Sequence, residues 1–348
     1  MHAAAIRSFL AGTLAFLTVL PGAELRAFAQ QQPPKKPAED QKEYQITVEV
    51  PLVRVDVVVT TQSGEFIPGL KRENFRILED GIPQTITNFS PTEEPITVVV
   101  LMEFSNYVGG WAPYFAREWS RDFLASLNKD DWAALVSFDM RPRIEADFTQ
   151  NKREIQDAVA RLYFPGFSEA NLFDAVVDTL DRLKDVKGKK SILLLASGYD
   201  SFSRINLDDM IMRVRQTDVT ILAVGTARYD FERIEHRLRG SAVVGYLQAE
   251  NQLRTFAEAT GGRAWFPRFE GELPGIFREA AAMLRNQYSL AYSPAGNDKP
   301  AGKYRKIKVE MVGPDGSPMI VVDQRGKKVK YVVYAKRGYI PAKGGVAD

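Results

Sequence analysis

Short apolar runs recur along the middle of the chain, and segments with helical periodicity separate them. The runs cover 96–102, 132–138, 191–196 and 219–224, and Val, Ile and Leu dominate them. Strands of a parallel sheet have this composition when helices cover both faces, because neither face meets water. The repeated order of strand and helix therefore predicts an α/β fold with a doubly wound, mostly parallel, Rossmann-like sheet between two helix layers.

The helical segments are identified by apolar residues three or four positions apart. In 112–127, for example, Phe115, Trp119, Phe123 and Leu127 follow one another at four-residue spacing, which places them on one face. The same spacing predicts helices over 152–162, 172–183, 207–214, 253–259 and 276–284. Residues 230–248 are predicted to be an inserted helix and loop, and the sequence does not indicate where they lie relative to the sheet.

Alternating apolar and polar residues flank this central region on both sides. Before it, strands are expected from Tyr44 onward, and a hairpin is expected around Asp80-Gly81. After it, strands are expected over 288–292, 304–312, 319–322 and 330–334. We predict that an N-terminal β region, 44–92, and a C-terminal β region, 288–341, pair into a small β-sandwich that carries an α/β domain, 93–287. Two independent β appendages are the alternative.

The first residues have the pattern of a secretory signal. Arg7 precedes an apolar run that ends at Leu20, and Ala27-Phe28-Ala29 offers a cleavage site, so 1–29 is predicted to be removed. The run of about 12 residues is shorter than the ~20 that span a bilayer, although an uncleaved anchor is the alternative. Residues 30–43, rich in Gln, Pro and Lys, are predicted to be a flexible linker. The mature chain would then be periplasmic, surface-held or secreted, with no membrane span.

Composition removes several classes of function. A formal net charge of +2 gives no electrostatic basis for binding nucleic acid. The chain has no cysteine, and His236 is the one histidine beyond the predicted signal. Zinc sites and thiol or histidine-based nucleophiles therefore lack their usual residues. We predict a protein that is not an enzyme.

Three polar loop tips are expected where a doubly wound sheet binds ligands, at the carboxyl ends of strands where the strand order reverses. The first is Glu103-Phe104-Ser105-Asn106-Tyr107. The second runs from Ser168 through Ala170-Asn171 into a helix, and the third is Ala196-Ser197-Gly198-Tyr199-Asp200. The predicted ligand-binding residues are Glu103, Ser105, Asn106, Tyr107, Ser168, Ala170, Asn171, Ser197 and Asp200.

These tips resemble the D-x-S-x-S, T-x-L-Y-D-A and T-D-G-x-D motifs of the metal-ion-dependent adhesion site of von Willebrand factor type A domains. The resemblance implies adjacent first and fourth strands and a Mg²⁺ ion held by oxygen ligands alone. The chain departs from the pattern at four ligand positions, and only Ser105 is unchanged. Glu103 and Ser197 stand where the family has aspartate, Ala170 where it has threonine, and Tyr107 where it has serine.

The departures weaken the case for a metal. Mg²⁺ requires oxygens at about 2.0–2.1 Å in octahedral geometry, whereas Glu103 is one methylene too long and Ala170 has no side-chain oxygen. We predict no cofactor, with Mg²⁺ or Mn²⁺ as the alternative.

Aromatic residues near the same edge of the sheet favour a protein partner. For Trp111 and Phe167, packing beneath the loops is the alternative. The aromatic residues are Tyr107, Trp111, Tyr114, Phe167 and Tyr199.

Further short motifs extend the resemblance over about 46–341. Leu78-Glu79-Asp80-Gly81, the run 288–292 (Tyr-Ser-Leu-Ala-Tyr), the run 304–309 and Arg337-Gly338-Tyr339 are similar to the acidobacterial VWFA-related domain family. This resemblance implies an exported von Willebrand type A protein and carries no settled biochemical role. The sequence thus predicts an exported, non-catalytic, metal-independent protein-interaction module. A divalent-cation-dependent adhesion or ligand-binding protein is the alternative.

Overall fold

The structure, a computed structural model, describes residues 52–91, 94–105, 121–162, 167–234, 239–296, 300, 302–322 and 326–341. Contacts divide the chain into two compact units, Met1–Thr47 and Val48–Asp348, and every element below belongs to the second. The predicted signal and linker, and the greater part of the predicted helix 112–127, lie outside the described residues. Within the described part of the chain, no helix combines the length and apolar character needed to cross a bilayer.

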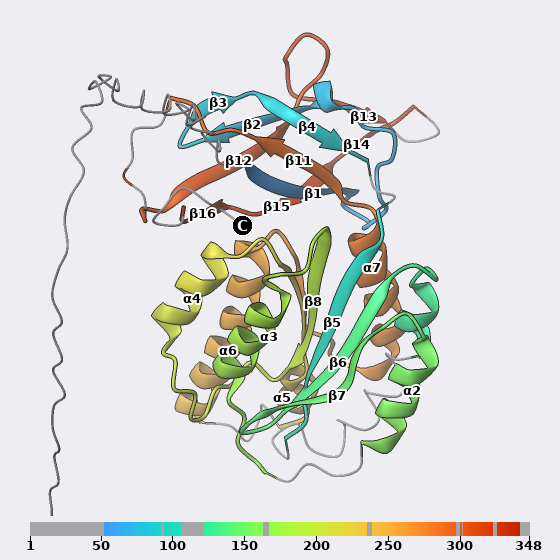
Figure 1. The fold of residues 1–348 in the computed structure, drawn as a ribbon, viewed down its shortest axis with the longest axis vertical. Helices are drawn as coiled ribbons and strands as arrows, with labels where there is room; N and C mark the ends of the chain where they lie inside the picture. The colour runs from blue at the N-terminus through green and yellow to red at the C-terminus, as the bar shows by residue number, and fades with distance from the viewer. Residues whose placement is uncertain are drawn as a thin grey trace, which may run out of the picture. The chain divides into compact units, whose positions relative to one another are not determined.

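A six-stranded sheet forms the centre of the α/β region, in the order β10-β9-β8-β5-β6-β7 (Figure 1). Its strands are β5 (Ile96–Glu103), β6 (Trp132–Phe138), β7 (Pro142–Thr149), β8 (Lys189–Ala196), β9 (Thr220–Gly225) and β10 (Ala264–Trp265). All neighbours are parallel except β6 and β7. The first strand, β5, lies between β6 and β8, so the strand order reverses there, and the predicted fold class is confirmed.

Helices cover both faces of this sheet, as a doubly wound fold requires. One core packs α3 (Leu172–Leu183), α4 (Leu207–Gln216) and α6 (Gly240–Ala259) against the sheet. The other packs α2 (Lys152–Arg161) and α7 (Leu273–Arg285), and Figure 1 shows the two groups on opposite sides. Asn151 and Asn206 begin α2 and α4 by accepting hydrogen bonds from backbone N–H groups of the first turn.

Two elements differ from the sequence-based expectation. The segment 230–248, expected as an inserted helix and loop, begins in the helix α5 (Ala227–Ile234), and from Gly240 it is the first half of the long helix α6 rather than a loop. Strand β7 was not expected at all. It pairs with β6 alone, at the sheet edge, and its outer positions meet solvent, so its sequence lacks the apolar run of a covered strand.

Two four-stranded antiparallel sheets form a β-sandwich from the regions before and after the α/β region. One has the order β15-β1-β11-β4 and the other β16-β12-β2-β3. Strands from the N-terminal side are β1 (Val53–Thr61), β2 (Phe75–Glu79), β3 (Ile82–Gln84) and β4 (Ile86–Ser90). Strands from the C-terminal side are β11 (Tyr288–Tyr292), β12 (Arg305–Met311), β15 (Tyr331–Ala335) and β16 (Gly338–Tyr339), with a separate hairpin of β13 (Val321–Val322) and β14 (Lys328–Val329). The described residues also include two short 3-10 helices, η1 (Arg72–Asn74) and η4 (Glu270–Glu272).

The sandwich core contains a buried carboxylate. Val53, Val55, Val57 and Val59 of β1 face this core at every second position. Beside them, Glu79 is fully buried and accepts hydrogen bonds from Tyr292 Oη at 2.7 Å and from Tyr339 Oη and Arg305 Nη1 at 3.0 Å. Burial, together with the neighbouring Glu79, raises the pKa of both tyrosines.

Asp80 and Gly81 follow Glu79 and make the predicted hairpin between β2 and β3. Both have positive φ, 48° and 88°, as a tight turn of this kind requires. The turn fixes the end of β2 and so places Glu79 opposite Ile307 of β12.

Candidate functional site

Glu103 ends β5 at the point where the strand order of the large sheet reverses. Its side chain is 2% exposed, although it lies at the end of a strand. Ser105 Oγ donates to Oε1 at 2.7 Å, and both the backbone N–H and the Oγ of Ser197 donate to Oε2 at 2.7 Å. The three residues come together because β5 and β8 are neighbours and both tips leave the same edge.

Burial has an electrostatic consequence for this carboxyl group. Removal from water raises the pKa of Glu103 above its ordinary value of 4.5, and the hydrogen bonds from Ser105 and Ser197 oppose that rise only in part. Glu103 is therefore easier to protonate than a carboxyl group on the surface.

Asn171 joins the second tip to two other loops. Its backbone N–H donates to the Asp139 carbonyl at 2.8 Å, and its Nδ2 donates to the Met140 carbonyl at 3.1 Å. Its Oδ1 accepts from the Phe202 backbone N–H at 3.1 Å. The preceding residue, Ala170, is buried and exchanges two further hydrogen bonds with Ser201.

Asp200 of the third tip contacts the start of α3. Its Oδ1 accepts from the Phe173 backbone N–H at 3.0 Å and from Ser203 Oγ at 2.5 Å, and its Oδ2 accepts from the Ser203 N–H at 3.4 Å. A carboxylate is stabilised there by the unpaired N–H groups and the positive end of the helix. Asp200 thus fixes the third loop to α3.

Gly198 lets α6 pack closely on this loop. Its φ is 90°, and a Cβ atom at this position would lie 2.5 Å from the carbonyl oxygen of Ala249. A larger residue would push the loop away from the helix. We name the edge formed by 103–105, 139–141, 167–171 and 197–203 the rim.

The described rim residues do not fit the divalent cation that the resemblance implies. Both carboxylate oxygens of Glu103 accept hydrogen bonds from serine groups, and Asp200 is bonded to α3 and Ser203. Ala170 offers no side-chain oxygen. Across the part of the chain that the structure describes, no three His, Cys, Asp or Glu side chains are grouped so that they could hold a metal ion.

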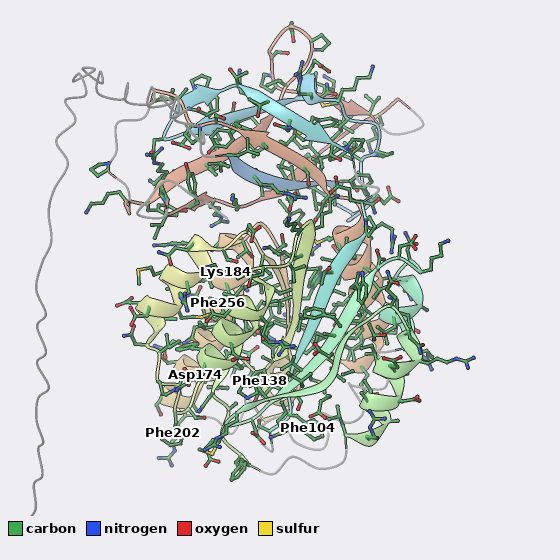
Figure 2. All side chains as sticks on the ribbon, viewed as in Figure 1. Phe104, Phe138, Asp174, Lys184, Phe202 and Phe256 are labelled. Carbon is green, nitrogen blue, oxygen red and sulfur yellow. The ribbon has the colours of Figure 1, made fainter. Side chains whose placement is uncertain are left out.

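The rim also exposes large apolar side chains. Phe202 is 66% exposed and Phe167 is 52% exposed, and Met140 of another rim loop is also exposed. Figure 2 shows Phe202 at the end of the α/β region where Phe104 and Phe138 also lie. Of the predicted aromatic residues that the structure describes, Phe167 is exposed and Tyr199 is partly buried.

The remaining predicted site residues do not help to define the geometry of the site. Ser168 is exposed beside Phe167, whereas Asn106, Tyr107, Trp111 and Tyr114 lie outside the described residues. Sequence reasoning missed Phe202 and Met140. Their positions in the sequence could have identified them, because Phe202 lies two residues after Asp200 and Met140 two residues after Phe138, in loops that follow predicted strands.

No family model matches the chain, and no curated protein matches its sequence. Among solved structures, a von Willebrand factor type A protein from Catenulispora acidiphila is 12% identical with a TM-score of 0.43, covering 85% of this chain and 76% of that one. The vWF domain of the type V pili tip protein Mfa5 from Porphyromonas gingivalis is 13% identical with a TM-score of 0.42, covering 56% of this chain and 96% of that one.

Proximal thread matrix protein 1 from the mussel byssus is 10% identical with a TM-score of 0.42, and the alignment covers 56% of this chain. It covers 49% of the mussel protein, so the chain spans about half the length of that relative. These similarities are too weak to transfer a ligand or a partner to this chain.

Proposed function

We propose that this chain is an exported, non-catalytic protein-interaction module that binds a protein partner through the rim without a metal ion. The observation that carries this proposal is Phe202, a largely exposed aromatic side chain on a loop whose backbone is held in place. Aromatic side chains dominate the energetics of many protein interfaces because they bury a large apolar area.

The loop around Phe202 loses little freedom when a partner binds. Asn171 accepts from the Phe202 N–H, Ser201 donates to the Ala170 carbonyl, and Asp200 accepts from Phe173 and Ser203. Ordering a loop on binding costs free energy, so a loop that is already ordered gives more affinity for the same contact area.

The chemistry of the rim suits a protein surface. Phe167 and Met140 add apolar area, and Arg141 and Arg204 are exposed near them. Aromatic residues, Met and Arg are the side chains enriched at protein interfaces. A partner with an apolar pocket bordered by carboxylates matches this arrangement.

Photo-crosslinking tests the position of the interface. A photoreactive phenylalanine analogue is placed at 202, at 167, or at the exposed Ile320 of the sandwich, and the protein is irradiated in an extract of the cells that produce it. We expect the two rim positions to capture one common protein that position 320 does not capture. Capture of that protein from position 320 alone would contradict the proposal.

The purified partner then allows a quantitative measurement. Phe202→Ala is expected to weaken binding by about 2 kcal/mol or more, about 30-fold in Kd, as for a buried aromatic anchor. Ile320→Ala serves as the matched control and should leave Kd unchanged.

Repeating the titration of the wild-type protein with EDTA and with millimolar MgCl₂ should give the same Kd. A requirement for Mg²⁺ would favour cation-dependent adhesion instead.

Export and the domain organisation complete the proposal. We infer that residues 1–29 are a signal peptide. We also infer that 44–92 and 288–341 form one sandwich module that carries the α/β domain 93–287. The pairing of β1 with β11 and β15 supports this domain organisation. N-terminal sequencing of the protein recovered outside the cytoplasm is expected to begin at Gln30. An intact Met1 on the exported protein would contradict cleavage.

A further inference from the structure

A cavity of about 860 Å³ lies on the side of the molecule away from the rim loops, where strands of the sandwich and helices of the α/β region both contribute its lining. One part of the wall comes from the start of β1, from Gly302 and from residues just before, in and after β16. The other part comes from the ends of α3 and α4 and from the two residues that follow α4 closely, Thr217 and Asp218. The lining includes Arg54, Leu180, Lys184, Met212, Lys336 and Ile340.

Hydrogen bonds and an ion pair fix the segments on both sides of β16. The Ile340 N–H donates to the Arg215 carbonyl at the end of α4, at 3.1 Å, and the Gly302 N–H donates to the Pro341 carbonyl at 3.2 Å. Arg337 pairs with Glu258 of α6 at 3.0 Å. Hydrogen bonds and an ion pair therefore join the segments that form this wall of the cavity.

Two lysines of the lining, Lys184 and Lys336, form no close ion pair with a described carboxylate. Asp181 pairs with Arg213 and Asp218 pairs with Lys190, each at 3.1 Å, so both lining carboxylates are neutralised. Among the residues that the structure describes, none forms an ion pair with Lys184 or Lys336. Figure 2 shows Lys184 just beyond the end of α3.

Lys336 is in an environment that disfavours its charge. Burial lowers the pKa of its ammonium group, and the carboxylates of Asp56 and Asp218 offset this only in part. An anion bound in the cavity would add to the attraction that Asp56 and Asp218 exert on Lys336.

The same cavity exposes apolar side chains. Leu52 is 46% exposed and Met212 is 43% exposed, and both line the cavity together with Leu180 and Ile340. Pockets for small molecules combine such apolar walls with a few placed polar groups. Lysines and exposed apolar residues in one cavity suit a ligand with an anionic head and an apolar body.

We propose that this cavity binds a small amphipathic organic anion, with its head group at Lys184 and Lys336 and its apolar chain against Leu180 and Met212. The site is separate from the rim, and its existence does not depend on the function proposed for the rim. A carboxylate on an alkyl chain is the simplest ligand of this class.

Isothermal titration calorimetry with dodecanoate below its micelle concentration tests the proposal. We expect saturable binding to the wild-type chain and at least a tenfold rise in Kd for Lys184→Gln combined with Lys336→Gln. Lys187→Gln is the matched control, because Lys187 is an exposed lysine of the loop after α3 that does not line the cavity. Absence of binding to wild type, or equal Kd values in the double variant, would overturn the proposal.

Two further arms separate a specific site from general adsorption. Dodecyl maltoside has the same chain with an uncharged head, and it should bind at least tenfold more weakly than dodecanoate. Should the double variant fail to fold, Lys184→Gln alone is used, since Lys184 is exposed and its loss leaves no buried group. A Kd for Lys184→Gln equal to that of Lys187→Gln would overturn the role of Lys184 as a head-group contact.

Discussion

Replacing Glu79 with alanine is expected to lower the free energy of unfolding of the β-sandwich by about 3–5 kcal/mol, because removal of one partner strands a buried charge. Arg305 is largely buried and directs Nη1 at Glu79, and Tyr292 and Tyr339 direct their hydroxyl groups at the same carboxylate. Alanine leaves a guanidinium group and two hydroxyl groups without this acceptor. Urea unfolding followed by circular dichroism measures the change.

Two further variants separate the charge from the hydrogen bonds. Glu79→Gln keeps an acceptor oxygen but removes the negative charge beside Arg305, so its loss should lie between wild type and alanine. Tyr292→Phe removes one donor and should cost about 1 kcal/mol, a typical net value for one hydrogen bond. A value for Glu79→Ala close to that of wild type would show that Arg305 finds another partner or water, and would contradict this account.

The second large effect concerns Glu103 and has a predictable pH dependence. Burial raises the pKa of Glu103 in the folded protein above its ordinary value, so the folded state binds its proton more tightly than the unfolded state does. The stabilisation from protonated Glu103 is complete below its ordinary, unfolded pKa of 4.5. It is lost as pH rises through the folded pKa, and the loss is about 1.4 kcal/mol for each pH unit that separates the folded pKa from the unfolded one.

Glu103→Gln removes this titration while keeping a side chain of the same size. Its amide oxygen can accept from the Ser197 N–H, and its NH₂ group can donate to a serine oxygen. The free energy of unfolding of Glu103→Gln minus that of wild type is therefore expected to increase as pH rises from the unfolded pKa through the raised folded pKa, as the wild-type carboxyl group ionises. Denaturant unfolding at several pH values measures this difference.

Glu73→Gln is the control for that series, because Glu73 is an exposed glutamate whose side chain pairs with Arg72 only at 3.7 Å. The Glu103→Gln series is compared with the Glu73→Gln series at the same pH values. A difference for Glu103→Gln that decreases with pH would mean that the folded protein prefers ionised Glu103, as a bound cation would require.

Strong apolar patterns made much of the fold predictable. The expected strand 132–138 and the expected helix 172–183 agree with β6 and α3 at both ends, because both elements are buried and their sequences show it. The first half of α6 was missed because Gly240 and Gly245 interrupt a segment whose residues are mostly exposed. The edge strand β7 was missed for a similar reason, since solvent contact leaves little apolar periodicity.

The site was predictable in position and less so in chemistry. Adjacent parallel strands bring their following loops to one edge, so motif alignment alone could group Glu103, Ser105 and Ser197. Which atoms bond to which depends on small differences in loop geometry, and periodicity cannot encode them. For the same reason, the contacts of Asn171 with Asp139, Met140 and Phe202 could not be read from the chain.

The chain enters and leaves the α/β region at one place on the sandwich. Ser90, at the end of β4, is paired with Ser289 near the start of β11, so the two ends of the intervening segment are adjacent. Domains whose ends lie close together tolerate insertion into a host. A tensile load applied by a bound partner at the rim would consequently reach the sandwich through two neighbouring, hydrogen-bonded strands, which would share it.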